Sequence, residues 1–154
     1  MQTYRSSVKC LIFAGLGLIS AAAWANTGTV TQLSGTLSVH KADGSVRILS
    51  QKSEVRTGDT INTQKDSYAQ IKFADGGMIT LKPNTSVKIQ AFQFKQEEPE
   101  KDSFVFGLLK GGLRAVSGLV GKRGNEDAYS MDTATATIGI RGTSYGADDC
   151  LTTP

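Results

Sequence analysis

The 154-residue chain carries 17 lysines and arginines against 14 aspartates and glutamates, with one histidine and two cysteines. Hydrophobic residues at 39% and charged residues at 20% lie close to the averages of globular proteins, which excludes wholesale disorder and a multi-span membrane protein. The length allows one small domain, and so few histidines and cysteines leave little material for metal or nucleophile chemistry, which argues against an enzyme.

Residues 1–25 have the features of a secretory signal peptide. A basic start with Arg5 and Lys9 precedes an apolar stretch over residues 10–19, and the segment ends in Ala23-Trp24-Ala25. The apolar stretch is shorter than the roughly 20 residues of a membrane-spanning helix, so we expect cleavage after Ala25 and not a membrane anchor. The sequence therefore predicts a periplasmic or secreted bacterial protein made of residues 26–154, with no membrane span after cleavage.

Cleavage changes both the charge and the cysteine count. It removes Arg5 and Lys9 and no acid, so the 17 basic residues fall to 15 against 14 acidic ones, a net charge of +1. Such a chain offers no broad basic field, which argues against nucleic acid as a partner. Cys10 also leaves, and the remaining Cys150 predicts an intermolecular disulfide or a partner cysteine beyond this chain.

Strand and turn signals alternate from residue 26 onward. Residues 36–40 and 46–48 alternate in polarity around the turn dipeptide Asp43-Gly44 and predict a first hairpin. Residues 69–73 and 78–82 flank Asp75-Gly76-Gly77 and predict a second, clearer hairpin.

The second half continues in the same way. Residues 86–91 predict a strand with Val87, Ile89 and Ala91 facing inward, and the polar residues 96–102 predict an exposed loop. Further apolar runs, separated by glycine-rich or polar segments, follow at residues 104–106, 113–116, 129–133 and 136–145.

No segment has a sustained helical period, and the 17 glycines lie mostly between strand-like runs. The sequence therefore predicts an all-β, glycine-rich single domain of short strands, solenoid-like or sandwich-like. Because glycine leaves few side chains for a deep core, we expect a solenoid-like coil more than a thick sandwich.

The sequence predicts no catalytic residue, no cofactor and no metal site. A Ser-His-Asp or Cys-His arrangement would require His40, the single histidine, and we expect this side chain to lie exposed at a strand end. The remaining contrast is one of charge: acids at residues 97–102 oppose Lys110, Arg114, Lys122 and Arg123. These segments are either two solvated loops or a contact surface for a charged partner.

Several short motifs occur in a defined order along the chain. They are LSGTL at residues 33–37, VRTGDTINT at 55–63, AQIKFADGG at 69–77, TLKPNT at 80–85, LKGGLR at 109–114 and TATIGIRGT at 135–143. This order and spacing resemble the FecR-type extracytoplasmic domain, named for the sensor that relays iron-citrate uptake to a sigma factor. The resemblance runs from about residue 30 to residue 147.

The resemblance implies an all-β domain that acts by contact with other envelope proteins and has no catalytic residues. We interpret the family-motif residues as structural, with glycines that supply turn conformations and polar side chains that bond local backbone. They are Gly58, Asp59, Thr63, Asp75, Gly76, Gly111, Gly112, Arg141, Gly142 and Thr143.

The chain also departs from the sensors of this family, which have a cytoplasmic sigma-binding part and a membrane span. Here a cleavable signal stands at the N-terminus, and the sequence stops soon after Thr143, so we expect a C-terminally truncated domain that does not signal across a membrane alone. The resulting hypothesis is a non-enzymatic binding, scaffold or sensor module that contacts envelope proteins, with a link to iron-responsive signalling. The alternative is a cell-wall or glycan-associated structural module.

Overall fold

The computed structural model describes residues 27–123, 125, 127–142 and 144–149. Regular structure in these residues consists of thirteen strands and a short 3-10 helix at Pro99–Lys101, which confirms the predicted all-β class. No helix among them is long and apolar enough to cross a membrane. The predicted signal peptide lies outside the described residues.

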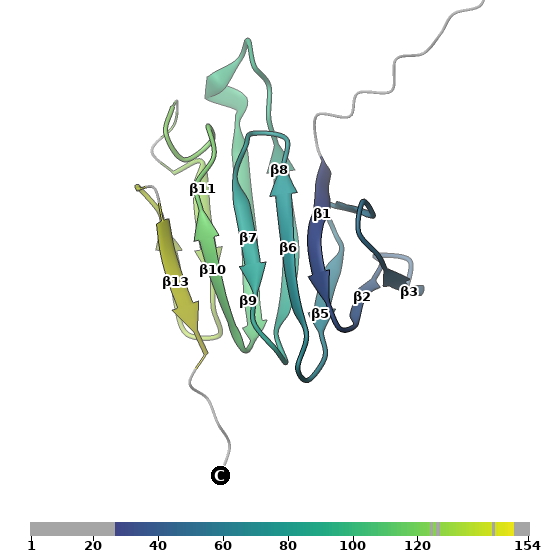
Figure 1. Cartoon of the computed structure of the whole chain (residues 1–154). Coiled ribbons are helices and arrows are strands. Elements are labelled where there is room, and N and C mark those ends of the chain that lie inside the picture. The colour runs from purple at the N-terminus through teal and green to yellow at the C-terminus, as the bar shows by residue number, and fades with distance from the viewer. Residues whose placement is uncertain (1–26, 124, 126, 143, 150–154) are drawn as a thin grey trace, which may run out of the picture.

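The strands form two sheets that face each other (Figure 1). Sheet A contains, in spatial order, β13 (Ser144–Asp148), β10 (Gly112–Val116), β7 (Met78–Leu81), β6 (Tyr68–Phe73), β1 (Thr27–Ser34) and β4 (Glu54–Arg56). Sheet B contains β12 (Thr137–Gly139), β11 (Tyr129–Asp132), β9 (Ser103–Lys110), β8 (Ser86–Gln93), β5 (Thr60–Thr63), β2 (Leu37–His40) and β3 (Val46–Leu49).

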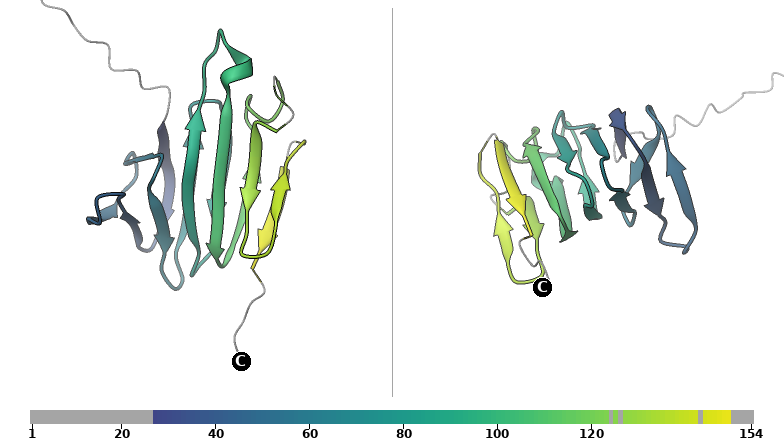
Figure 2. Two further views of the ribbon diagram at one scale, coloured as in Figure 1. Left: turned by 180° about the vertical axis from the view of Figure 1, so that it is seen from behind. Right: turned by 60° about the horizontal axis from the view of Figure 1, so that its bottom comes forward.

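The chain passes repeatedly from one sheet to the other while it advances along the molecule. Strands β1 to β5 lie at one end, and β11 to β13 lie at the other, as both views in Figure 2 show. The layers are therefore sandwich-like, while the order of winding is that of a coil. In the described part of the chain, no further strand pairs beyond the edge strands, which are β4 and β13 in sheet A and β3 and β12 in sheet B.

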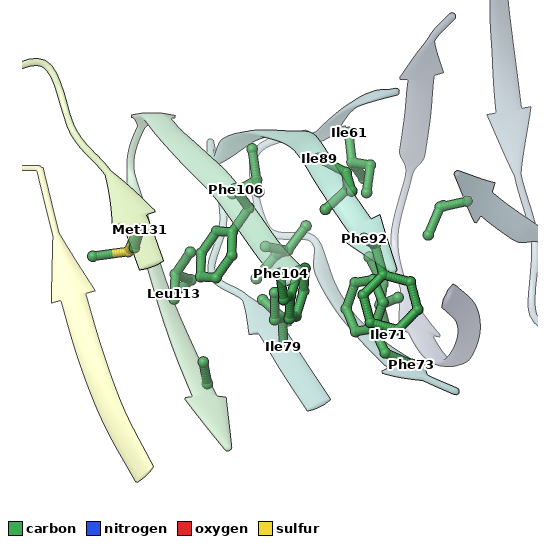
Figure 3. Close-up of a cluster of buried hydrophobic side chains, with 14 of the residues drawn as sticks. Ile61, Ile71, Phe73, Ile79, Ile89, Phe92, Phe104, Phe106, Leu113 and Met131 are labelled. Atoms are coloured by element: carbon green, nitrogen blue, oxygen red, sulfur yellow. The ribbon is translucent and has the colours of Figure 1, made fainter. Parts of the chain in front are cut away.

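A continuous apolar core fills the space between the sheets and is deeper than the glycine content suggested. Its centre is a group of aromatic rings in which the centroid of Phe104 lies 4.5 Å from that of Phe73, 5.0 Å from Phe92 and 5.3 Å from Phe106 (Figure 3). The ring of Tyr129 lies 5.2 Å from Phe104. Tilted and edge-on pairs of this kind each add about 0.5–1.5 kcal/mol beyond the burial of their area. Rings from both sheets thus hold the layers together.

Both predicted hairpins are present, as β2–β3 and β6–β7. The inward positions expected in residues 86–91 are only partly correct. Val87 and Ile89 are buried, but a bulge between Ile89 and Ala91 shifts the alternation, so Phe92 is buried while Ala91 is half-buried.

The last predicted run, residues 136–145, does not form one apolar strand. It divides between β12, whose three residues are exposed at the edge of sheet B, and β13 in sheet A. The two sheets meet again here, because the hydroxyl oxygens of Tyr129 on β11 and Tyr145 on β13 lie 2.9 Å apart.

Candidate functional site

Asp59 is buried and bonds the chain around it. Its carboxylate accepts a hydrogen bond from the backbone N–H of Arg56 at 2.9 Å and forms an ion pair with Lys41 Nζ at 2.7 Å. The neighbouring Gly58 has φ +90°, and its N–H donates to the carbonyl of Ile89 at 2.7 Å. These contacts close the turn between β4 and β5 and fasten it to β8.

Thr63 belongs to a chain of hydrogen bonds that joins three turns. Its hydroxyl donates to the carbonyl of Lys82 at 2.6 Å and accepts the N–H of Thr85 at 2.9 Å. The Thr85 hydroxyl in turn donates to the carbonyl of Gly112 at 2.8 Å and accepts its N–H at 3.0 Å. Both threonines are buried, and all of these bonds except the one to Lys82 are buried as well, so they satisfy backbone groups that are shielded from water.

Asp75 is a buried carboxylate that forms no ion pair with any described residue. It accepts the N–H of Gly77 at 2.9 Å and that of Val120 at 3.3 Å. Burial raises its pKa, although these two hydrogen bonds act in the opposite direction. Asp75 thus braces the β6–β7 turn against the segment that follows β10.

The acidic loop before β9 is anchored to the rest of the domain by Arg123. As predicted, residues 96–101 of this loop are exposed or half-buried, but its last residue, Asp102, is buried and pairs with Arg123 Nε at 3.2 Å. The guanidinium of Arg123 also donates to the carbonyls of Lys95 and Gln96 and lies over the ring of Phe94. Asp102 and Arg123 are therefore paired with each other, and the choice between two solvated loops and a contact surface for a charged partner stays a prediction.

The remaining candidate residues do not converge on a site. His40 is exposed at the end of β2, as predicted, and Arg141 and Gly142 are exposed between β12 and β13. Among the described residues, no three of His, Cys, Asp and Glu come close enough to hold a metal ion. Thr143 and Cys150 lie outside the described residues, so the disulfide stays a prediction.

The free edge of β3 is the most exposed apolar feature of sheet B. Val46 is 56% exposed and Ile48 is 69% exposed, and both lie on the last strand of the sheet. The hairpin is closed by a hydrogen bond from the N–H of Lys41 to the carbonyl of Ser45. Because bonded pairs alternate along an antiparallel ladder, the backbone groups of Val46 and Ile48 then point to the free edge.

A charged hollow of about 730 Å³ lies beside this edge. Two of its cations are paired, Lys41 with Asp59 and Arg56 with Glu54. Arg47, Lys52 and Asp43 also line the hollow and form no ion pair in the described part of the chain, which leaves one positive charge in excess. The edge strand is thus flanked by a partly uncompensated positive charge.

Sequence reasoning located the β3 strand but missed its exposure. The alternation of Val46, Arg47 and Ile48 suggests one buried face, yet all three side chains are exposed. Their burial depends on which strands lie beyond β3, and that order is a property of the whole fold. The one available signal was the arginine between two branched apolar residues, which is typical of an edge strand.

The comparisons with known proteins give one family and one structural likeness. The FecR protein family matches residues 59–152, more than half of the chain. A solved structure described as "Cell surface anchoring domain" is 25% identical, with a TM-score of 0.40, over 41% of this chain and 83% of that one. No curated protein matches the chain significantly.

The family match begins at Asp59, the residue that closes the β4–β5 turn, and it spans the Thr63–Thr85–Gly112 chain and the Asp75 brace. The family match therefore covers the segment that contains these hydrogen-bonded turns, in agreement with the resemblance drawn from the order of the motifs. The chain belongs to the FecR protein family.

Proposed function

We propose that this protein is a non-enzymatic binding module of the bacterial cell envelope, periplasmic or secreted, that acts through protein contacts. Membership of the FecR family supports an envelope-associated module. The predicted signal peptide and the hydrogen-bonded, structural placement of the motif residues are consistent with export and with a role in binding.

The free edge of β3 is the observation that carries this proposal. An edge strand with exposed backbone groups is a template on which an extended segment of another protein adds as a further strand. Val46 and Ile48 offer side chains for that contact, and Arg47 and Lys52 favour a segment that contains acidic residues. The partner is an envelope protein of still undefined identity.

Site-specific photocrosslinking in intact envelopes tests this proposal. A crosslinking side chain at position 48 should capture one dominant envelope protein, identified by mass spectrometry. The matched control is position 109 on β9, because Leu109 is 54% exposed on the same sheet but lies on an interior strand. Equal capture from both positions, or capture of nothing by a folded chain, would contradict the proposal.

An Ile48→Pro variant that carries the crosslinking side chain at position 46 separates strand addition from simple apolar contact, because Val46 is also exposed on β3. The N–H of Ile48 points to the free edge, so proline removes a donor needed by an added strand and spares the bonds between β2 and β3. We expect at least a tenfold loss of capture with little change in melting temperature, and Ile48→Thr, which keeps the N–H, should lose less. A transporter or a sigma regulator as the captured partner would link the module to iron-responsive signalling.

The alternative is a cell-wall or glycan-associated structural module, and one observation favours it. The outer face of sheet A has an uncharged hollow beside the exposed ring of Tyr68. Pelleting with isolated sacculi discriminates between the two functions, because a module that binds only proteins stays in the supernatant.

A further inference from the structure

Tyr68 lies at an uncharged hollow of about 450 Å³ on the outer face of sheet A. Tyr68 is 53% exposed, and its ring contacts none of the aromatic rings that pack in the core. An exposed ring on a sheet face supplies an apolar surface together with a polar hydroxyl end. Tyr68 is thus suited to a ligand that has both an apolar face and polar groups at its rim.

Polar side chains that both donate and accept hydrogen bonds surround this ring. Gln70 pairs with Gln32 on β1 and with Thr80 on β7, so the three form a row across neighbouring strands. All three line the hollow, and Gln51 joins them from the turn before β4. Amide and hydroxyl groups of this kind match ligand hydroxyls, which also donate and accept.

A bulge in β1 orients the central amide of this row. The register of β1 against β6 shifts between Val30 and Gln32, which places Thr31 beside Gln70. The Thr31 hydroxyl donates to Gln70 Oε1 at 3.1 Å, so the amide nitrogen of Gln70 remains as the donor for a ligand.

The chemistry of the lining selects the class of ligand. Among the described residues, no lysine, arginine, aspartate or glutamate lines the hollow, which disfavours a charged ligand that would need pairing. Strands β1, β6 and β7 are interior strands whose backbone groups bond their neighbours, so an extended peptide cannot add here as it can at β3. A sugar ring has an apolar C–H face and a rim of hydroxyls, and it fits both observations.

We propose that this hollow binds a neutral glycan strand, with Tyr68 stacked on a sugar ring and with Gln32, Gln70 and Thr80 bonded to its hydroxyls. The inference deepens the alternative function and names its site. It involves sheet A and not the edge of sheet B, so its failure leaves the proposed protein contact at β3 untouched, and the converse also holds.

Isothermal titration calorimetry of the purified chain tests the proposal with two neutral trisaccharides, chitotriose and cellotriose, and with anionic trigalacturonate. Saturable binding of at least one neutral sugar is expected, without binding of trigalacturonate, and the preferred sugar identifies whether an acetamido or a plain hydroxyl glycan is the ligand. Tyr68→Thr, which keeps a residue favoured in strands, should weaken that binding at least tenfold.

Two variants on the same strand complete the experiment. Gln70→Ala should weaken neutral-sugar binding severalfold, while Lys72→Ala, on the same face but outside the hollow, should leave it unchanged. The proposal is overturned by no saturable binding to a folded chain, by trigalacturonate binding as well as the neutral sugars, or by Tyr68→Thr binding like the wild type.

Discussion

At the scale of single residues, Thr63 shows how one hydroxyl stabilises several turns. It lies at the end of β5, is 4% exposed, and bonds both the carbonyl of Lys82 and the N–H of Thr85. The bond to the Thr85 N–H is buried and the bond to the Lys82 carbonyl is partly buried, so water can replace the threonine only poorly at the Thr85 N–H. The contribution of Thr63 therefore comes mainly from what its removal would leave unsatisfied.

Replacing Thr63 by valine should lower the free energy of unfolding by about 1–3 kcal/mol, because valine keeps the shape and loses both hydrogen bonds. Urea unfolding followed by circular dichroism measures the effect. Thr60→Val is the matched control, since Thr60 lies on the same strand, is half-buried, and should change stability by less than about 0.5 kcal/mol. Equal losses in the two variants would show that the hydroxyl of Thr63 has no special role.

At the scale of elements, the turn glycines differ in what surrounds them. Gly76 in the β6–β7 turn and Gly111 in the β9–β10 turn have φ of +84° and +82°, which side chains rarely adopt. A Cβ at Gly76 would meet nothing within 4 Å, whereas one at Gly111 would lie 2.6 Å from the carbonyl oxygen of Asn84. The first position carries only a conformational requirement, and the second adds a steric one.

Gly76→Ala should therefore cost about 1–2 kcal/mol of stability, from the left-handed backbone alone. Gly111→Ala should cost at least about 1 kcal/mol more, because backbone atoms of the 82–85 turn must move to admit the methyl group. The midpoints of urea unfolding compare the two variants directly. If Gly111→Ala were as stable as Gly76→Ala, the β9–β10 turn could move away from the 82–85 turn at little cost in free energy.

Elements that depend on local sequence were predictable, and those that depend on distant partners were not. Asp43-Gly44 and Asp75-Gly76 mark their hairpins because a tight turn needs glycine at a fixed place. The bulge that buries Phe92 in place of Ala91 is set by pairing with β9, and no pattern within residues 86–91 contains that information. The division between β12 and β13 likewise depends on which sheet has a free edge.

At the scale of the whole molecule, the candidate sites were the least predictable part. Exposure is the property that makes Val46, Ile48 and Tyr68 candidates for binding. It follows from the order of strands in the two sheets and not from the neighbouring residues in sequence. The motif residues drew attention in the sequence because they recur in the family, and the structure places the described ones mainly in turns and buried hydrogen bonds. The proposed binding surfaces lie elsewhere on the fold.

Asp75 connects the stability of the whole molecule to pH. It joins the β6–β7 turn to the segment between β10 and β11, and Leu119 N–H also bonds its backbone carbonyl at 2.9 Å. Burial raises the pKa of its carboxyl, and the negative charge of Asp102 adds to the rise. An acid whose pKa is higher in the folded than in the unfolded state binds protons more tightly when folded.

The stability that Asp75 contributes is therefore fully present below its unfolded pKa, near 3.8, and is lost as pH rises through its folded pKa. The variant Asp75→Asn does not titrate at this position, and the free energy of unfolding that it loses with the hydrogen bonds does not depend on pH. We expect the free energy of unfolding of the wild type, minus that of Asp75→Asn, to increase as pH falls from 7 toward 4. Urea unfolding of both proteins at matched pH values measures this difference, and a difference that stays constant or decreases in acid would refute the raised pKa.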